Sequence, residues 1–487
     1  MGIENQDELI DHPTWLEHIR FFFDSQDVEC MKTAMNLDLA TYEGVKRKAK
    51  QIYQQTKAGN MPPQQTRKWP ANRVQTFENW MTDKFPMGSS PLEQAELKEL
   101  TLAAGPKQRR NAAWLSAAEI MLLKKAFSGI MARDTTDPQS YFAIAGVHWF
   151  PDPHCVHHLP QYNPWHRVYI DRFEAALRSV EGCEDVKLPY WDILAPIPAW
   201  LFEVPFDSYT IPVDVSPNHP AGTKTQRYDK QAIEASISES QIGDWIKQGL
   251  DSPEWERFAR SIEQAHDQGH VAIGSAMERP SIAAFDPIFW FFHCNWERMW
   301  WAWQKRHSAD TLGAFRKTIT SADTEWLDSA SQNELDPFGV ATEHTIDTAP
   351  YAYENAPVEL FATRAFTQSG SVPADRFFRL GITPKLSVRV KGIERLRING
   401  TFVVHLFGDG QPLTRQAFFQ AETPTTCPNC IEHAKVDIDL LVDRHQAMGK
   451  RLEVKVESLE PGLADPWVPL ADIGSPTINV RELIASD

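Results

Sequence analysis

The sequence predicts a mainly α-helical protein, with a four-helix-bundle domain, a helical N-terminal extension and a β-rich C-terminal domain. Apolar residues recur at helical spacing up to about residue 355, and beyond that point apolar and polar residues alternate. Five of the 16 histidines fall within HWFPDPHCVHHLPQYNPWHR (148–167), inside the helical region. At 487 residues the chain is long enough for two or three domains.

Residues 1–105 form the first predicted segment, the helical extension. Three stretches have helical patterns, separated by breaks that contain proline and glycine: TWLEHIRFFFDSQ, YEGVKRKAKQIYQQT and NRVQTFENWMTDKF. None of them concentrates catalytic residue types. We therefore expect a packing or assembly role for this segment rather than a catalytic one.

Residues 106–355 carry the strongest helical signals. Ser116 and Glu119 form a capping box that opens an apolar-periodic helix. Three residue pairs mark further helix starts: Asn163-Pro164, Ser252-Pro253 and Asp286-Pro287. The segment after the last pair is apolar nearly all round, which predicts a buried helix.

Residues 356–487 form the β-rich domain. LSVRVKGIERLRINGTFVVHLFGDG and RLEVKVESLE alternate apolar with polar residues, which is the pattern of half-buried strands. The Asn-Gly and Asp-Gly pairs in the first of them are typical of tight turns. The boundary with the helical domain lies near PYAYENAP (350–357).

The charge and the first residues limit the partners and the location. The net charge of −16 argues against nucleic acid or an anionic membrane as a partner, because both require clustered cations. No apolar run is long enough to span a bilayer. The first residues, MGIENQDELIDHPTW, lack the basic and apolar regions of a secretory signal, so we expect a cytoplasmic protein.

Histidines on predicted buried faces indicate a metal site. His266 and His270 lie one turn apart on the apolar face of a predicted helix. That spacing alone is common by chance, but a buried imidazole without a partner costs desolvation free energy. His166 lies on the inward face of a second helix, His157 in the loop before it, and His293 among the aromatic residues of a third. Imidazole ligands without carboxylates suit copper or zinc rather than magnesium or calcium.

Four motifs resemble the copper-binding signatures of tyrosinases and related type-3 copper polyphenol oxidases: HCVHHLPQYNPWHR, LPYWDI (188–193), HDQGH (266–270) and FDPIFWFFHCNWERMWWAWQ (285–304). The resemblance covers about residues 106–355. It implies two copper ions as cofactors, O2 as co-substrate and small phenolic compounds as substrates. It leaves open whether monophenols are hydroxylated, whether the enzyme is instead a catechol or o-aminophenol oxidase, and whether the centre carries dioxygen as in haemocyanins. The oligomeric state is also open, a homo-oligomer included.

The resemblance assigns the copper ligands. The first copper ion takes three histidines: His148, His157 and His166. His154 is the alternative to His148, and His158 is a supporting residue or a bystander. The second copper ion also takes three histidines: His266, His270 and His293. Many members have a histidine where this chain has Phe292, which leaves His293 as the candidate there.

A cysteine and three acidic residues complete the implied site. Fungal members link a cysteine to the second ligand by a thioether bond, which implies such a bond between Cys155 and His157; a plain buried thiol is the alternative. Hydroxylation requires a base, because phenols have a pKa of about 10. The resemblance implies that Asp267 and Glu263 supply it through a held water, with Glu256 as a second candidate partner. For Asp267, a purely supporting carboxylate is the alternative.

The segment FVVHLFGDGQPLTRQAFFQAETPTTCPNC resembles, more loosely, the C-terminal domain of long-form fungal tyrosinases. This likeness implies a zymogen in which an aromatic side chain plugs the site. Phe418 is the expected plug, with Phe419 beside it, and strand core is the alternative for both. The likeness also implies that Cys427 and Cys430 take part in copper delivery, since thiolates suit Cu(I).

Overall fold

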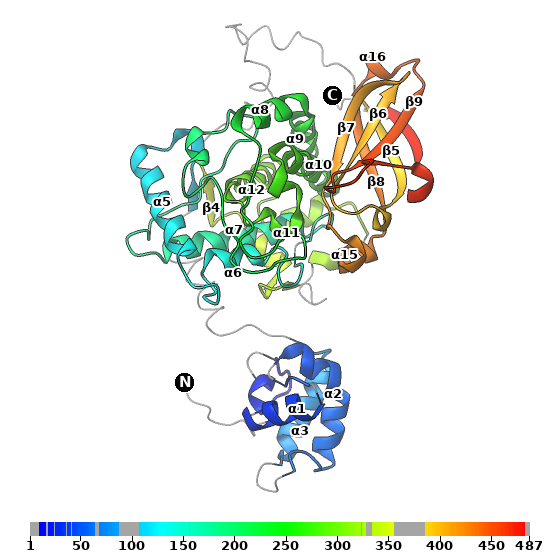
Figure 1. The fold of residues 1–487 in the computed structure, drawn as a ribbon. Helices are drawn as coiled ribbons and strands as arrows, with labels where there is room; N and C mark the ends of the chain where they lie inside the picture. Colours follow the sequence, from blue (N-terminus) through cyan, green and yellow to red (C-terminus); the bar gives the residue numbers. More distant parts are fainter. Residues whose placement is uncertain are drawn as a thin grey trace. The chain divides into compact units, whose positions relative to one another are not determined.

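The computed structural model describes residues 9–15, 18–23, 25–35, 37–39, 41–63, 68–86, 107–154, 156–322, 324–327, 334–354 and 385–482. The chain divides into two compact units. The first comprises Met1–Gly105 with Phe338–Ala341, and the second comprises Pro106–Pro337 with Thr342–Asp487. Within the second unit, Figure 1 shows a helical part in cyan to green and a strand-rich part in orange to red.

The first unit is a small helical domain around an aromatic core. Its helices are η1 (Ile19–Phe22), α1 (Ser25–Met35), α2 (Tyr42–Lys57) and α3 (Ala71–Thr82). Trp80 is fully buried, and its ring centroid lies 6.0 Å from that of Trp15 and 5.5 Å from that of Phe77. The helical character predicted for this segment is confirmed.

Nine helices build the described helical part of the second unit: α5 (Ala117–Met131), α6 (Tyr141–Gly146), α7 (Tyr162–Arg178), α8 (Lys230–Glu239), α9 (Ile242–Asp251), α10 (Trp255–Ile273), α11 (Pro280–Ala283), α12 (Ile288–Arg306) and α13 (Leu312–Phe315). α7 packs against α5 and α12, and α10 packs against α12 and α9. Every residue of α12 from Ile288 to Trp300 is buried, as its apolar sequence predicts.

The helix starts follow the predicted signals with two exceptions. After Ser252-Pro253, helix α10 begins only at Trp255 and has no side-chain cap. Ser116 caps α5, and the capping box with Glu119 is present. At the start of α12, the main-chain N–H of Ile288 donates to Asp286 Oδ1 (3.1 Å). The predicted cap at Asn163 is wrong, because α7 begins one residue earlier, at Tyr162, and has no side-chain cap.

A buried charge network joins the two ends of the helical domain. β1 (Lys107–Arg109) pairs in parallel with β4 (Tyr351–Tyr353). From β1, the fully buried Arg109 donates to Glu297 on α12 (3.0 Å) and to Asp171 on α7 (2.8 Å). A buried charge requires such partners, so this network fixes α7 relative to α12.

The C-terminal part is a β-sandwich. Its strands are β5 (Lys385–Glu394), β6 (Phe402–Gly408), β7 (Gln411–Phe418), β8 (Lys435–Asp443), β9 (Leu452–Ser458), β10 (Trp467–Val468) and β11 (Thr477–Glu482). One sheet has the order β10-β9-β6-β7 and the other β11-β5-β8. Apolar side chains from both sheets share one core, and the expected Asp409-Gly410 turn joins β6 to β7. The remaining described elements include β2 (Glu334–Leu335), β3 (Val340–Ala341), α15 (Pro428–Glu432) and α16 (Arg444–Ala447).

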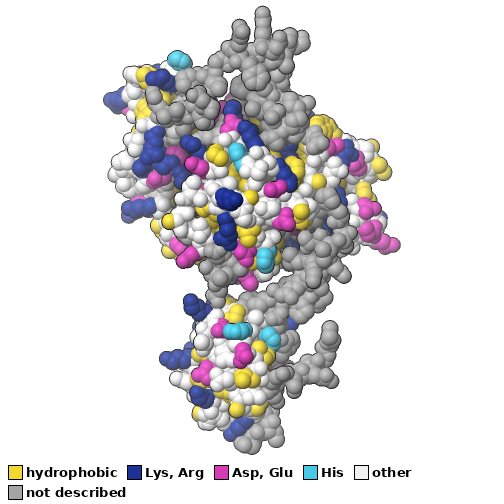
Figure 2. Space-filling model, turned by 180° about the vertical axis from the view of Figure 1, so that it is seen from behind, with side chains coloured by type: hydrophobic (Ala, Val, Ile, Leu, Met, Phe, Trp, Pro, Cys, Tyr) yellow, Lys and Arg dark blue, Asp and Glu magenta, His cyan; other side chains and the backbone are white. Residues whose placement is uncertain are grey.

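Charged side chains of both signs are interspersed on the face shown in Figure 2. Among the helices that the structure describes, none is long and apolar enough to cross a membrane.

Candidate metal centre

Three histidines from different segments form the first triad: His148 after α6, His157 in the following loop and His166 at the start of the second turn of α7. Each offers a ring nitrogen, and these nitrogens lie within 4.8 Å of one another. All three side chains are buried. The long loop between α6 and α7 thus turns back to bring His157 beside its two partners.

The second triad comes from two helices, with His266 and His270 on α10 and His293 on α12. Their ring nitrogens also lie within 4.8 Å of one another, and the Nε2 atoms of His266 and His270 are 2.9 Å apart. The two triads are adjacent, because the rings of His166 and His293 stack at 4.5 Å.

The imidazoles are held from behind, which leaves nitrogens for a metal. Three Nδ1 atoms lie within hydrogen-bonding distance of main-chain carbonyls: His148 with Pro280 (3.1 Å), His166 with Tyr162 (2.8 Å) and His270 with Met277 (2.6 Å). Nε2 of His148 and both ring nitrogens of His293 are buried and have no hydrogen-bond partner in the described part of the chain. Buried nitrogens of this kind suit metal ligation, and a set made only of imidazoles suits copper or zinc.

Burial also keeps these rings neutral. It lowers the pKa of all six histidines, to about 4 for His148 and about 3 for His270. The neighbouring imidazoles lower the pKa further for the other four. Metal ligation requires the neutral form, so both triads are prepared for it near neutral pH. Copper binding by the six histidines stays a prediction.

The other two histidines of the cluster lie outside the triads. His154 pairs through Nδ1 with Asp336 (2.5 Å), so the structure does not support it as the alternative to His148. The ring of His158 stacks on Phe418 (4.1 Å between centroids), and its Nε2 lies 3.1 Å from the carbonyl oxygen of Phe419. Cys155 lies outside the described residues, so its thioether bond stays a prediction.

Asp267 lies between the second triad and the C-terminal part. It is fully buried, and its Oδ1 lies 3.0 Å from Nδ1 of His266. Its Oδ2 accepts a hydrogen bond from the main-chain N–H of Phe419 (3.1 Å). Burial, followed by the charge of Glu263, raises the pKa of Asp267 well above its ordinary value. Asp267 therefore both orients a triad histidine and contacts the C-terminal part.

The two glutamates differ in position. Glu263 is buried and accepts a hydrogen bond from the main-chain N–H of His158, and burial raises its pKa to about 8. Glu256 instead accepts hydrogen bonds from the backbone of Thr320 and Ser321. It lies ten residues before His266 on α10, which is about 15 Å along a helix axis. The expectation that Glu256 could replace Glu263 is therefore wrong.

Phe419, rather than the predicted Phe418, covers the triads. Phe418 ends β7 with its ring in the sandwich core, stacked on Phe402 (5.1 Å). Phe419 is fully buried, and its ring stacks on His270 (4.0 Å between centroids, 17° between planes). The expected plug was therefore wrong by one residue, because consecutive side chains of an extended chain point to opposite sides.

Gln416 on β7 docks the C-terminal part on α9 and α10. Its side-chain oxygen accepts from Trp245 Nε1 (2.8 Å) and from Gln268 Nε2 (2.7 Å). Its nitrogen donates to the carbonyl of Gln264 (2.9 Å). All donors and acceptors of this amide are thus used across the interface or nearby, which the sequence alone did not indicate.

A second contact follows Phe419 along the chain. Glu422 Oε1 lies 3.0 Å from Nε2 of His219 and accepts from Ser281 Oγ (2.8 Å). Burial raises the pKa of Glu422, but the hydrogen bonds from His219 and Ser281 outweigh it, so the pKa lies below its ordinary value. The charge of Arg279 also lowers the pKa of Glu422, and the charge of Glu422 in turn adds to the effect of burial in raising the pKa of Glu460.

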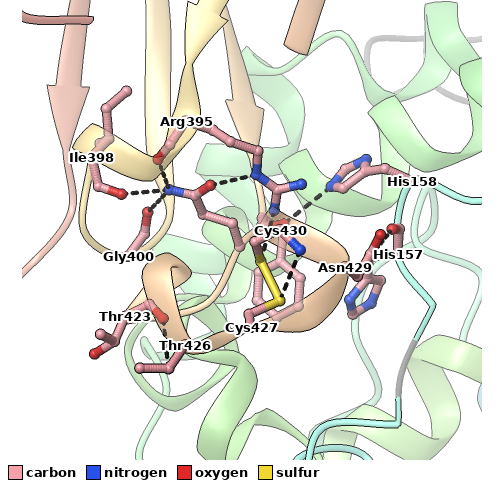
Figure 3. Close-up of a disulfide and its surroundings, with 12 residues drawn as sticks. His157, His158, Arg395, Ile398, Gly400, Thr423, Thr426, Cys427, Asn429 and Cys430 are labelled. Carbon is pink, nitrogen blue, oxygen red and sulfur yellow. Dashed lines mark hydrogen bonds between the residues drawn. A yellow bond between two sulfur atoms is a disulfide. The ribbon is translucent and has the colours of Figure 1, made fainter. Parts of the chain in front are cut away.

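Cys427 and Cys430 form a disulfide at the start of α15 (Figure 3). An oxidised pair has no thiolate, so Cu(I) delivery by these residues would require prior reduction. Between them, Asn429 donates from Nδ2 to the main-chain carbonyl of His157 (2.9 Å). Figure 3 shows Asn429 beside His157, where the C-terminal part meets the loop of the first triad.

Comparison with known proteins identifies the helical part. Residues 138–209 and 201–306 match the common central domain of tyrosinase. The chain contains a tyrosinase-family central domain. The tyrosinase from Burkholderia thailandensis has the same fold, with a TM-score of 0.55 and 19% identity, over 77% of this chain and 100% of that one.

Two curated relatives represent different functions. The tyrosinase HcTyr2 of Hahella sp. (strain CCB-MM4) is 22% identical over an alignment of 462 positions, gaps included, that covers 64% of this chain and 83% of the relative. Hemocyanin 2 of Megathura crenulata is 25% identical over an alignment of 224 positions, gaps included, that covers 40% of this chain and 6% of the relative. The tyrosinase-family assignment thus holds, while the reaction of this chain requires a separate argument.

Proposed function

We propose that this chain is a copper-dependent oxidase of phenols, held latent by its C-terminal β-sandwich. The single observation that supports it most is the pairing of two buried, carboxylate-free histidine triads with one aromatic ring that stacks on His270 and meets His157 edge-on. Two copper ions bound by the triads would supply O2 binding and the two-electron oxidation of a phenolic ring.

The residues of the chain divide the remaining tasks. The carbonyls behind His148, His166 and His270 hold the rings in fixed orientations. Asp267 holds His266 in the same way. Glu263 is the carboxyl that would accept the proton of an incoming monophenol, because it is buried and bonded to the main chain of His158 in the loop of the first triad. The proposal therefore includes hydroxylation of monophenols. The alternative is an enzyme that oxidises only catechols or o-aminophenols.

Latency rests on the position of Phe419. Its fully buried ring takes the place beside His270 that a phenol would need, so substrate could enter only after the sandwich moves away. A dioxygen carrier would need no such movement, because O2 is small. The haemocyanin relatives make carriage of O2 the competing proposal.

Oxygen uptake by copper-loaded protein tests the proposal. We would supply tyrosine, a catechol and an o-aminophenol to the full-length chain and to the Phe419→Ala variant, with zinc-loaded protein as the control. We expect coloured quinone from the variant with copper alone, and faster formation than from the full-length wild type. Reversible O2 binding without quinone from either protein would favour carriage and reject the oxidase.

A further inference from the structure

The ring of Phe419 lies across both triads. It stacks on His270 of the second triad and meets His157 of the first edge-on, with 5.0 Å between ring centroids. Its edge-on distance to His266 is 6.0 Å. If the proposed function is correct, the ring of a phenol must reach this same place, so Phe419 is a template for the bound substrate.

The main chain of Phe419 is held as specifically as its ring. Its N–H donates to Asp267 Oδ2 (3.1 Å), and its carbonyl oxygen accepts from His158 Nε2 (3.1 Å), which carries the proton. Both partners belong to the helical domain, Asp267 on α10 and His158 in the loop before α7. Neither contact depends on the side chain of residue 419.

Asp267 and His158 are both held in place by the helical domain itself. Asp267 is fully buried and keeps its other oxygen on His266. The His158 backbone has a positive φ of 63°, unusual for a non-glycine residue, and its N–H is fixed by Glu263. Asp267 Oδ2 and His158 Nε2 lie 3.7 Å apart, which is too long for a good hydrogen bond between them. When the sandwich leaves, this acceptor and this donor lose their hydrogen bonds to Phe419 beside the ring position. Unpaired polar groups at such a place favour a ligand that supplies the missing bonds.

We propose that Asp267 and His158 form a subsite for the substituent of the substrate, selective for tyrosyl-type phenols. These compounds carry an N–H and a carbonyl on the same carbon, one methylene from the ring, as Phe419 does. Asp267 Oδ2 accepts from the N–H, and His158 Nε2 donates to the carbonyl. Phenols that lack either group leave one buried partner unpaired, which corresponds to at least about a 5-fold weaker association.

Binding to metal-free, full-length protein tests the subsite without any turnover. The probes are N-acetyl-L-phenylalanine methylamide, its depsi analogue with an ester oxygen in place of the N–H, and N-acetylphenethylamine, which lacks the carbonyl. Competition with the sandwich weakens all three by the same factor, so the ratios of their Kd values report the subsite alone. We expect the first probe to bind at least about 5-fold more tightly than either other probe.

His158→Phe is the informative variant, because it keeps an aromatic ring against Phe418 and removes the donor. We expect it to abolish the preference over N-acetylphenethylamine and to preserve the preference over the depsi analogue. The control is Glu422→Gln, which changes docking of the sandwich and should change all three affinities equally. Equal binding of the three probes to the wild type, or unchanged ratios in His158→Phe, would overturn the subsite.

Turnover separates this inference from the proposed function on which it rests. In copper-loaded protein, the matching tyrosine derivatives compete for the same enzyme, and their kcat/KM ratio does not depend on the open fraction. The same preference is expected there. If the probe with both groups binds preferentially but no phenol is turned over, the oxidase is rejected and the subsite stands. If phenols are turned over without that preference, the subsite is rejected and the oxidase stands.

Discussion

Replacing Phe419 by alanine should activate the copper-loaded protein. The ring is fully buried against His270, and burial of a phenylalanine side chain stabilises the closed state by about 1.5–3 kcal/mol. Loss of that stabilisation shifts the equilibrium between closed and open states by about 10- to 150-fold, since each 1.36 kcal/mol is a factor of ten. If the wild type is mostly closed, its initial rate of catechol oxidation should rise by a similar factor.

The assay is the initial rate of O2 consumption with catechol at equal copper content. Phe402→Ala is the matched control, because it removes another fully buried ring from the same sandwich without touching a histidine of the triads. It should cost the sandwich about 3–5 kcal/mol of stability but leave the rate near that of the wild type while the domain is folded. An unchanged rate in Phe419→Ala, or an equal rise in Phe402→Ala, would refute the reasoning.

Three further predictions concern the sandwich. Gln416→Ala leaves buried partners unpaired at the interface, at a cost of about 1–3 kcal/mol each. It should therefore raise the oxidation rate at least about 5-fold with Phe419 intact. No change in the rate would mean that this contact does not hold the sandwich in place. Burial raises the pKa of Glu422, but the hydrogen bonds from His219 and Ser281 bring it below its ordinary 4.5. The stabilisation is therefore present above that pH and is lost as the pH falls through the lowered pKa. Brief acid exposure should therefore activate the wild type. The Glu422→Gln variant should be more active than the wild type at neutral pH and less sensitive to acid. The initial rate of catechol oxidation after each exposure measures both effects. Replacing Cys427 and Cys430 by serine opens a four-residue loop and should reduce the unfolding free energy by about 2 kcal/mol, measured in urea; an unchanged midpoint would contradict this.

Much of the site could be predicted because its signals are local. His266 and His270 share a helix face by their spacing alone, and His293 stood out among aromatic residues. His148 was different, because only the resemblance of its segment to fungal members indicated it, and no periodicity connects it with His166.

The contacts between the helical and β-rich parts could not be predicted. Phe419 N–H bonds to a residue 152 positions away, and Asn429 to one 272 positions away, so neither leaves a local pattern. The choice between Phe418 and Phe419 depended on which face of β7 meets the sandwich core, and that follows from the pairing of β7 with β6. Alternation along the strand predicts that Phe418 and Phe419 point to opposite sides, but it does not predict which of the two faces the histidines.

Copper content is the most direct test of the central claim, that two triads of histidines hold two copper ions. Elemental analysis of copper-loaded, full-length protein should give two copper ions per chain. His293→Ala should give about one, because it removes a ligand from the second triad and none from the first. One copper ion per wild-type chain, or two in the variant, would contradict the account.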